Sequence, residues 1–418
     1  MTVRTWALIA LAVLVVAIAV TAAVLVPWHE APAPRSDQLA ALRSLPADQV
    51  ARGRSFTAAL RPGTYGSILV GLAVAVVLGL TPLGTHVVTA VARPFGGGWV
   101  ARALVGGLVI LFIATLVTLP FSARQHVVQR RFGLSTQGWS GWFVDVLKGY
   151  AVSAVIGAIA LLGFYTIVHF VPRWWWAWAA AGAAAIVVLL SFVFPVLVEP
   201  VFNKFTPMPE SPLRTSLMQL ADRDGVPVTD VLVADASRRT RAVNAYVSGF
   251  GATRRIVVYD TLLQQAPDDQ VVSVVAHELG HAKDGDVVTG TLIGALGAAA
   301  AVIVVYLLGE WGWLLRRAGV ESISDPRAIG LILAIATIAG LLSQPMMNYV
   351  SRHIEARADH HALVLTNDPA SFGAMQRSLS ALNLANPDPN PFEYTMFASH
   401  PSTVERIAAA TAYARGER

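Results

Sequence analysis

The chain contains no cysteine, which excludes disulfides, thiolate metal sites and cysteine nucleophiles. It is also poor in charge, because Asp, Glu, Lys and Arg together make up only 14% of its 418 residues, whereas 55% are hydrophobic. Soluble domains carry about 25% charged residues. The composition therefore predicts a protein of the lipid bilayer, in which any metal has to bind through histidine or carboxylate side chains.

Seven apolar stretches approach the roughly 20 residues that a transmembrane helix needs. They are Trp6–Val26, Ser67–Val88, Ala101–Phe121, Tyr150–Val171, Trp174–Val198, Val287–Leu308 and Ala328–Met347. The first is longer than the apolar region of a signal peptide, so we expect it to be retained as a membrane helix. Tryptophans at the start of the fifth stretch are typical of a membrane interface.

Basic residues are unevenly shared between the two sides that these stretches define. The net charge of +5 could suggest nucleic acid, but the arginines lie in loops between apolar runs, so no nucleic-acid partner is predicted. The richer side carries Arg35, Arg43, Arg52, Arg54, Arg61, Arg124, Arg130, Arg131 and Lys148. The positive-inside rule places that side, the segment 199–286 and the C-terminus in the cytoplasm.

The chain divides into four parts on this interpretation. Residues 1–198 form five membrane helices with their loops, and residues 287–347 form the sixth and seventh. Residues 199–286 and 348–418 are more polar and form a catalytic domain. In the first of these, the patterns predict a helix over 213–224 and short strands over 228–233 and 255–259. The segment 244–249 is either ordinary sheet or an edge that pairs with an extended peptide.

The segment His277-Glu278-Leu279-Gly280-His281 is an HExxH motif. Residues four apart lie on one face of a helix, so His277 and His281 can bind one metal ion while Glu278 lies beside it. The alternative is a solvated helix start whose histidines flank the membrane surface. We favour a catalytic zinc ion, one per chain, with Glu278 as the general base that activates water.

A catalytic zinc site usually has a third protein ligand, and Glu355 is the predicted one. It shortly follows the seventh apolar stretch, just as the HExxH motif immediately precedes the sixth. Asp359, one turn later, can orient a ligand histidine, although a salt-bridged helix face explains it equally well. His400 and Arg406 are candidates for stabilising the oxyanion. Asp286 is interpreted as the point where water gives way to lipid.

These motifs resemble those of the type 1 CAAX prenyl endopeptidases, a family of integral-membrane zinc metalloproteases. The resemblance rests on the segments 199–207, 244–246, 277–281, 351–359 and 400–407. It implies an α-helical polytopic fold, with seven transmembrane helices around a chamber and a gluzincin-like domain that carries a small β-sheet. It also implies zinc held by His277, His281 and Glu355, with Glu278 as the base.

The predicted substrate is a peptide or protein, either lipid-modified or tethered to the membrane, cleaved at the cytoplasmic membrane surface. The composition, rich in alanine, arginine and valine, is typical of bacteria and predicts a bacterial plasma membrane. One alternative is a quality-control protease that cleaves membrane proteins broadly. A more remote one is a metal-binding transporter without hydrolysis, but the apolar stretches contain almost no charged residues to line a pathway.

Overall fold

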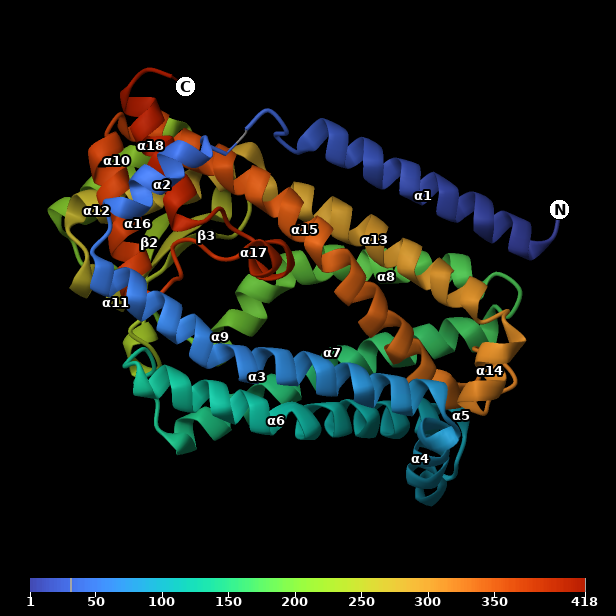
Figure 1. Cartoon of the computed structure of the whole chain (residues 1–418). Helices are drawn as coiled ribbons and strands as arrows, with labels where there is room; N and C mark the ends of the chain where they lie inside the picture. Colours follow the sequence, from blue (N-terminus) through green and yellow to red (C-terminus); the bar gives the residue numbers. More distant parts are fainter. Residues whose placement is uncertain (31, 418) are drawn as a thin grey trace.

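The computed structural model describes residues 1–30 and 32–417. Within them, seven helices are long and apolar enough to cross a membrane, which confirms the predicted polytopic helical fold. They run roughly along one another, away from the end of the molecule that holds the sheet (Figure 1). The helices are α1 (Val3–Leu25), α3 (Ala47–Leu80), α6 (Gly107–Arg131), α7 (Trp139–Phe170), α8 (Trp175–Val193), α13 (Asp286–Leu308) and α15 (Ile329–Thr366).

Short helical segments extend or connect these spans. Before α6 lie α5 (Trp99–Ala101) and the π-helix η2 (Arg102–Gly106), and after α8 lie the π-helix η3 (Phe194–Val198) and α9 (Glu199–Phe202). The others are α4 (Pro82–Ala92), α14 (Gly312–Ala318) and the 3₁₀ turns η1 (Arg93–Phe95), η4 (Ala236–Arg238), η5 (Gly251–Thr253) and η6 (Pro326–Ala328).

The second predicted span differs from the structure, because the stretch 67–88 is not one helix. Helix α3 ends at Leu80, Thr81 is extended (φ −134°, ψ 163°), and α4 begins with Pro82. Proline lacks the N–H that would continue the helix and disfavours a helical conformation in the residue before it. The hydroxyl of Thr81 instead accepts a hydrogen bond from the N–H of Leu83.

Helices α3 and α15 pack closely through glycine. A Cβ atom on Gly79 would lie 2.4 Å from the Cβ of Ala334 and 2.7 Å from the carbonyl oxygen of Gly330. A Cβ atom on Gly330 would lie 2.4 Å from the carbonyl oxygen of Leu78. Small residues allow this approach between membrane helices. The contact anchors one end of α15, the helix that carries Glu355 at its other end.

The sheet has four strands, β1 (Phe205–Pro207), β2 (Asp230–Ala234), β3 (Ala245–Ser248) and β4 (Arg255–Tyr259), in the order β1-β2-β4-β3. Strands β2 and β4 are parallel, and β3 pairs antiparallel with β4. Because β3 is last in this order, it lies at an edge of the sheet.

The strand predicted over 255–259 is confirmed with the same bounds, whereas the strand predicted over 228–233 begins at Asp230.

Helices pack on the sheet to form the core of the polar domain. They are α10 (Pro212–Asp224), α11 (Asp260–Gln265), α12 (Asp268–Asp284) and α16 (Pro369–Leu382). Buried side chains from these helices, from strands β2, β3 and β4 and from the end of α15 meet in one cluster, which includes Leu217, Val231, Ile256, Val275, Leu279, Leu363 and Phe372.

The N-terminal segment after α1 lies against the C-terminal end of the chain (Figure 1). Helix α2 (Arg35–Arg43) packs on α18 (Thr403–Ala414). Helix α17 (Pro391–Phe397) precedes α18 in the chain. Arg35 forms a bidentate ion pair with Asp388, with both N–O distances at 2.8 Å. Arg415 donates to Asp37 at 2.6 Å.

Candidate metal centre

Helix α12 (Asp268–Asp284) carries the whole HExxH motif near its C-terminal end. Asp268 and Asp269 occupy its first turn, where carboxylates interact favourably with the helix dipole. Val271, Val275 and Leu279 are fully buried in the core. The helix ends at Gly285, whose positive φ of 69° is readily adopted only by glycine and reverses the chain into α13.

Helix α15 is a single helix that continues from the apolar span into the polar domain. It buries Ala358, Ala362 and Leu363 against neighbouring elements. Glu355 and Asp359 lie one turn apart and are 7% and 3% exposed, respectively. Two carboxylates at this depth require partners, because an unpaired buried charge is strongly unfavourable.

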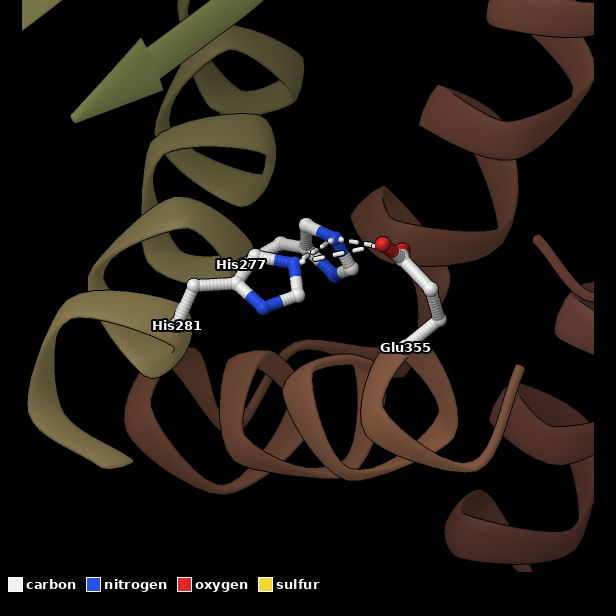
Figure 2. A group of neighbouring side chains, drawn as sticks. All are labelled: His277, His281 and Glu355. Carbon is white, nitrogen blue, oxygen red and sulfur yellow. Dashed lines mark hydrogen bonds and ion pairs between the residues drawn. The ribbon is translucent and has the colours of Figure 1, made fainter. Parts of the chain in front are cut away.

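The side chains of His277, His281 and Glu355 point toward one another from α12 and α15 (Figure 2). The Nε2 atoms of the two histidines are 3.1 Å apart. Nε2 of His277 lies 3.2 Å from Oε2 of Glu355, and Nε2 of His281 lies 3.6 Å from Oε1. Ligand atoms around a tetrahedral zinc ion, each at about 2.0–2.2 Å from the metal, are roughly 3.3–3.5 Å apart. Each histidine thus has one oxygen of Glu355 at about the distance expected between ligands of one ion, and one ligand atom from each of the three residues lies within 4.8 Å of the others.

The second nitrogen of His277 faces Asp359, with 2.9 Å between Nδ1 and Oδ1. Asp359 is also bound by Arg406, whose Nε donates to Oδ2 at 2.8 Å and whose Nη2 donates to Oδ1. The Nη2 atom of Arg406 is 3.3 Å from the same Nδ1. Because arginine only donates, we assign the Nδ1 proton to the contact with Asp359, which leaves the Nε2 lone pair free for a metal.

His281 has the corresponding contact with Asp286, and sequence analysis missed it. Nδ1 of His281 lies 2.8 Å from Oδ2 of Asp286. The other oxygen of Asp286 accepts from Nη2 of Arg357, and Nε of that arginine pairs with Asp284 at 2.8 Å. Asp286 is therefore more than a marker of the membrane boundary. The signal in the sequence was an aspartate just past the glycine that ends the HExxH helix.

The charges of the centre fit a bound cation. Burial lowers the pKa of His277, but the adjacent carboxylates of Asp359 and Glu355 outweigh burial and raise that pKa to about 10. The two carboxylates thus favour positive charge on the ring, which a divalent ion supplies equally well. Oε2 of Glu355 is buried and makes no well-aligned hydrogen bond within the described residues. Burial also raises the pKa of Glu278, as suits a general base.

His400 and Arg406 occupy different environments. The His400 side chain is 60% exposed, and its Nδ1 lies 2.8 Å from Oε2 of Glu355. Arg406 is largely buried behind Asp359, and the Gln376 amide, oriented with its oxygen toward the guanidinium, accepts from it at 3.1 and 3.2 Å. His400 therefore lies beside Oε2 of Glu355, whereas Arg406 lies at the Nδ1 side of His277.

Two cavities meet at Glu278, one toward each end of β3. A cavity of about 410 Å³ is lined by Gly249, Phe250, Glu278, His281 and Val350. Another of about 310 Å³ is lined by Asn244, Glu278, Met375, Leu379 and His400. Asn244 immediately precedes β3 and Gly249 immediately follows it. A chain lying along the β3 edge would therefore pass the carboxylate of Glu278 with room on either side.

The fold and the site define a multi-pass membrane metallopeptidase, and comparisons with known proteins agree. The model of peptidase family M48 matches residues 207–414, and that of the CAAX prenyl protease N-terminal region, described as five membrane helices, matches residues 63–204. The chain belongs to peptidase family M48, and its relatives include the type 1 CAAX prenyl proteases. The resemblance drawn from the sequence motifs is thus confirmed.

Individual relatives match across most of their length. The chain is 31% identical to the CAAX prenyl protease 1 homologue of Oryza sativa, over 72% of this chain and 71% of the relative. It is 30% identical to an uncharacterised metalloprotease of Bacillus subtilis, YhfN, over 72% and 71%. The crystal structure of S. mikatae Ste24p superposes with a TM-score of 0.78 at 23% identity, covering 97% of this chain and 98% of that one. These matches favour proteolysis over the transporter alternative.

Proposed function

We propose that the chain is a zinc endopeptidase that cleaves membrane-tethered peptides or proteins at the cytoplasmic surface of a bacterial plasma membrane. The carrying observation is the convergence of His277, His281 and Glu355 where two membrane helices enter the polar domain. Helix α13 begins at Asp286, directly after the HExxH helix, and α15 carries Glu355 beyond its apolar span. A site at this boundary suits a substrate that is itself held by the bilayer.

In the proposed mechanism, His277, His281 and Glu355 hold the zinc ion, and Asp359 and Asp286 fix the two imidazole rings. Bound zinc would lower the pKa of water to about 7 and polarise the scissile carbonyl. Glu278 accepts the proton of the attacking water and then donates it to the departing amine. We propose that His400, exposed beside Glu355, donates to the carbonyl oxygen as negative charge develops on it.

The position of β3 at the end of the sheet supports the proposed mode of substrate binding. An extended peptide can add to this edge through backbone hydrogen bonds, so that recognition of the main chain is largely independent of sequence. The side chains next to the cleaved bond then enter the two cavities beside Glu278. This arrangement favours cleavage within a chain and demands an extended segment.

The division of the chain also remains a proposal. Residues 1–198 would supply five membrane helices, 287–347 two more, and 199–286 and 348–418 the two halves of the catalytic domain. The last boundary falls inside the continuous helix α15. The chamber implied by the family resemblance stays a prediction as well.

Cleavage-site mapping by mass spectrometry tests the function. Purified enzyme is loaded with zinc and given one peptide in a prenylated and an unprenylated form, with Glu278→Gln as the inactive control. Preference for the prenylated form supports a lipid-bearing substrate, which is what the names of the plant and yeast relatives state for those proteins. Equal cleavage supports the broad quality-control alternative. Cleavage by neither form above the Glu278→Gln control refutes the peptidase proposal for this substrate class.

The absence of cysteine offers a clean test of orientation. Single cysteines replace the exposed Arg223 on α10 and the exposed Glu321 between α14 and α15. In intact cells, a membrane-impermeant maleimide should label the second and spare the first. The opposite pattern would place the metal centre outside the cell.

A further inference from the structure

Arg352 on α15 binds the end of α17 in two ways. Its Nη1 donates to the carbonyl oxygen of Ala398 at 2.7 Å and to that of Tyr394 at 3.1 Å. The guanidinium carbon also lies 4.4 Å from the centroid of the Tyr394 ring, within the range of a cation–π interaction. A cation placed at the C-terminal carbonyls of a helix is favourable as well. One side chain thus holds both the backbone and the ring of the same segment.

Neighbouring contacts secure both ends of the segment 394–402. Asn348, one turn before Arg352 and 2% exposed, donates from Nδ2 to the carbonyl oxygen of Thr395 at 3.2 Å. At the other end, Glu405 accepts from the N–H of Ser402 at 2.6 Å and from the hydroxyl of Tyr394 at 2.7 Å. The segment is therefore tied to α15 at its beginning and to the first turn of α18 at its end.

His400 lies in this segment, and its position depends on these ties. Its side chain is largely exposed, so its own packing does little to fix the ring, and ordering such a group costs conformational entropy. Glu355, whose Oε2 is 2.8 Å from Nδ1 of His400, follows Arg352 by three residues on the same helix. Arg352 and Glu355 therefore belong to one rigid element, and fixing the segment to Arg352 fixes His400 relative to Glu355.

Arg352 makes none of the ion pairs found among the described residues, although Glu405 and Asp359, which pairs with Arg406, line the same cavity. Its hydrogen bonds go to two carbonyl groups, and its charge lies against aromatic rings. A lysine there has a compact ammonium on a flexible stem and lacks the planar guanidinium that Arg352 places over the Tyr394 ring. The arrangement is thus specific to arginine.

We propose that Arg352 is a positioning residue that holds His400 over the cleaved bond. This inference rests on the proposed peptidase function. It gives Arg352 a role in fixing the segment 394–402 and no role in binding the metal. It predicts that the loss of Arg352 matters only as long as His400 is present.

A double-mutant cycle tests the inference on purified, zinc-loaded enzyme. Arg352→Gln should lower kcat by about tenfold to a hundredfold, the cost of a misplaced group, with KM changed by less than about threefold. In the His400→Ala background the same substitution should change kcat by less than about twofold. Arg352→Lys should retain an intermediate rate. The exposed Arg223→Gln on α10 is the matched control for loss of an arginine and should leave kcat unchanged.

Hydrogen exchange of the metal-free protein gives a readout that is independent of activity. Arg352→Gln should speed exchange in residues 394–401 while residues 270–284 keep their protection. Equal effects of Arg352→Gln with and without His400, or unchanged exchange in 394–401, would overturn the inference. If Arg352→Gln does not fold, the same cycle with Arg352→Lys decides. A failure of the peptidase proposal itself would give a different result, because the wild-type enzyme would then cleave no faster than Glu278→Gln.

Discussion

Nδ1 of His281 lies 2.8 Å from Oδ2 of Asp286, across the glycine at which α12 ends and α13 begins. The first residue of a membrane helix thus orients one of the two histidines of the HExxH motif. The contact exists because Gly285 adopts a left-handed conformation and turns the start of α13 back toward the ring. The metal centre and the adjacent span are consequently one structural unit.

Asp286→Ala should weaken zinc binding by about tenfold to a hundredfold, because carboxylate partners of ligand histidines contribute about that much to metal affinity. The measurement is competition with a chelator of known affinity, followed by metal analysis. The exposed Asp222→Ala is the control and should bind zinc as the wild type does. Wild-type affinity in Asp286→Ala would show that Asp286 has no part in metal binding.

Substitutions of Glu278 and of Glu355 should have different effects on zinc binding and cleavage. Glu278→Gln should keep zinc and lose at least about a hundredfold in kcat, because general acid–base groups contribute roughly 10²–10⁴-fold. Glu355→Ala should lose both zinc and cleavage, because only His277 and His281 remain. Metal content and peptide cleavage are measured on the same preparations. Undiminished cleavage by Glu278→Gln would remove Glu278 from its role.

Arg406→Leu should destabilise the protein by about 3–5 kcal/mol, because it leaves the buried carboxylate of Asp359 without its cation. The double variant Arg406→Leu with Asp359→Asn should recover part of that loss, since the uncompensated charge is gone. Thermal unfolding in detergent, at a fixed zinc concentration, gives the comparison. A double variant as unstable as the sum of the single ones would argue against coupling between these residues.

Protonation of Glu393 on α17 should lower the stability of the folded protein in acid. The hydrogen bond with Arg61 lowers the pKa of Glu393 below its usual value of 4.5, outweighing burial, which raises it. A folded-state pKa below the unfolded one means that the ion pair stabilises the protein above about pH 4.5 and that this contribution is lost as the pH falls through the lower, folded value. Thermal unfolding at pH 7 should therefore separate the wild type from Glu393→Gln. The difference should shrink below pH 4.5, and a difference independent of pH would contradict the prediction.

The sequence predicted what depends on local periodicity. The helical spacing of the HExxH motif, the seven apolar spans and the short apolar run that predicted β4 are all short-range patterns. Glu355 was found only because a site with two histidines requires another ligand near a second membrane helix, and the two helices do bring these side chains together.

Features that depend on tertiary contacts were missed. Asp286 resembled any polar residue before an apolar run until the turn at Gly285 directed it to His281. Arg406 was predicted as a candidate for stabilising the oxyanion, and the sequence did not show that the packing of α18 on α16 buries it against Asp359 and Gln376. The three-residue strand β1 has too few residues for an alternating pattern, and pairing with β2 alone defines it.

Because α15 is long, a small tilt at one end of the helix moves the other end by a large distance. Glu355 lies roughly 37 Å along the helix from the close contact at Gly330, at about 1.5 Å per residue. If the helix moved as one body, a tilt of about 3° at that contact would swing the carboxylate by roughly 2 Å, about ten times the tolerance of a metal–ligand bond of roughly 0.2 Å. An ion bound by His277, His281 and Glu355 would therefore tie α15 to α12 and oppose such a tilt of the membrane helix.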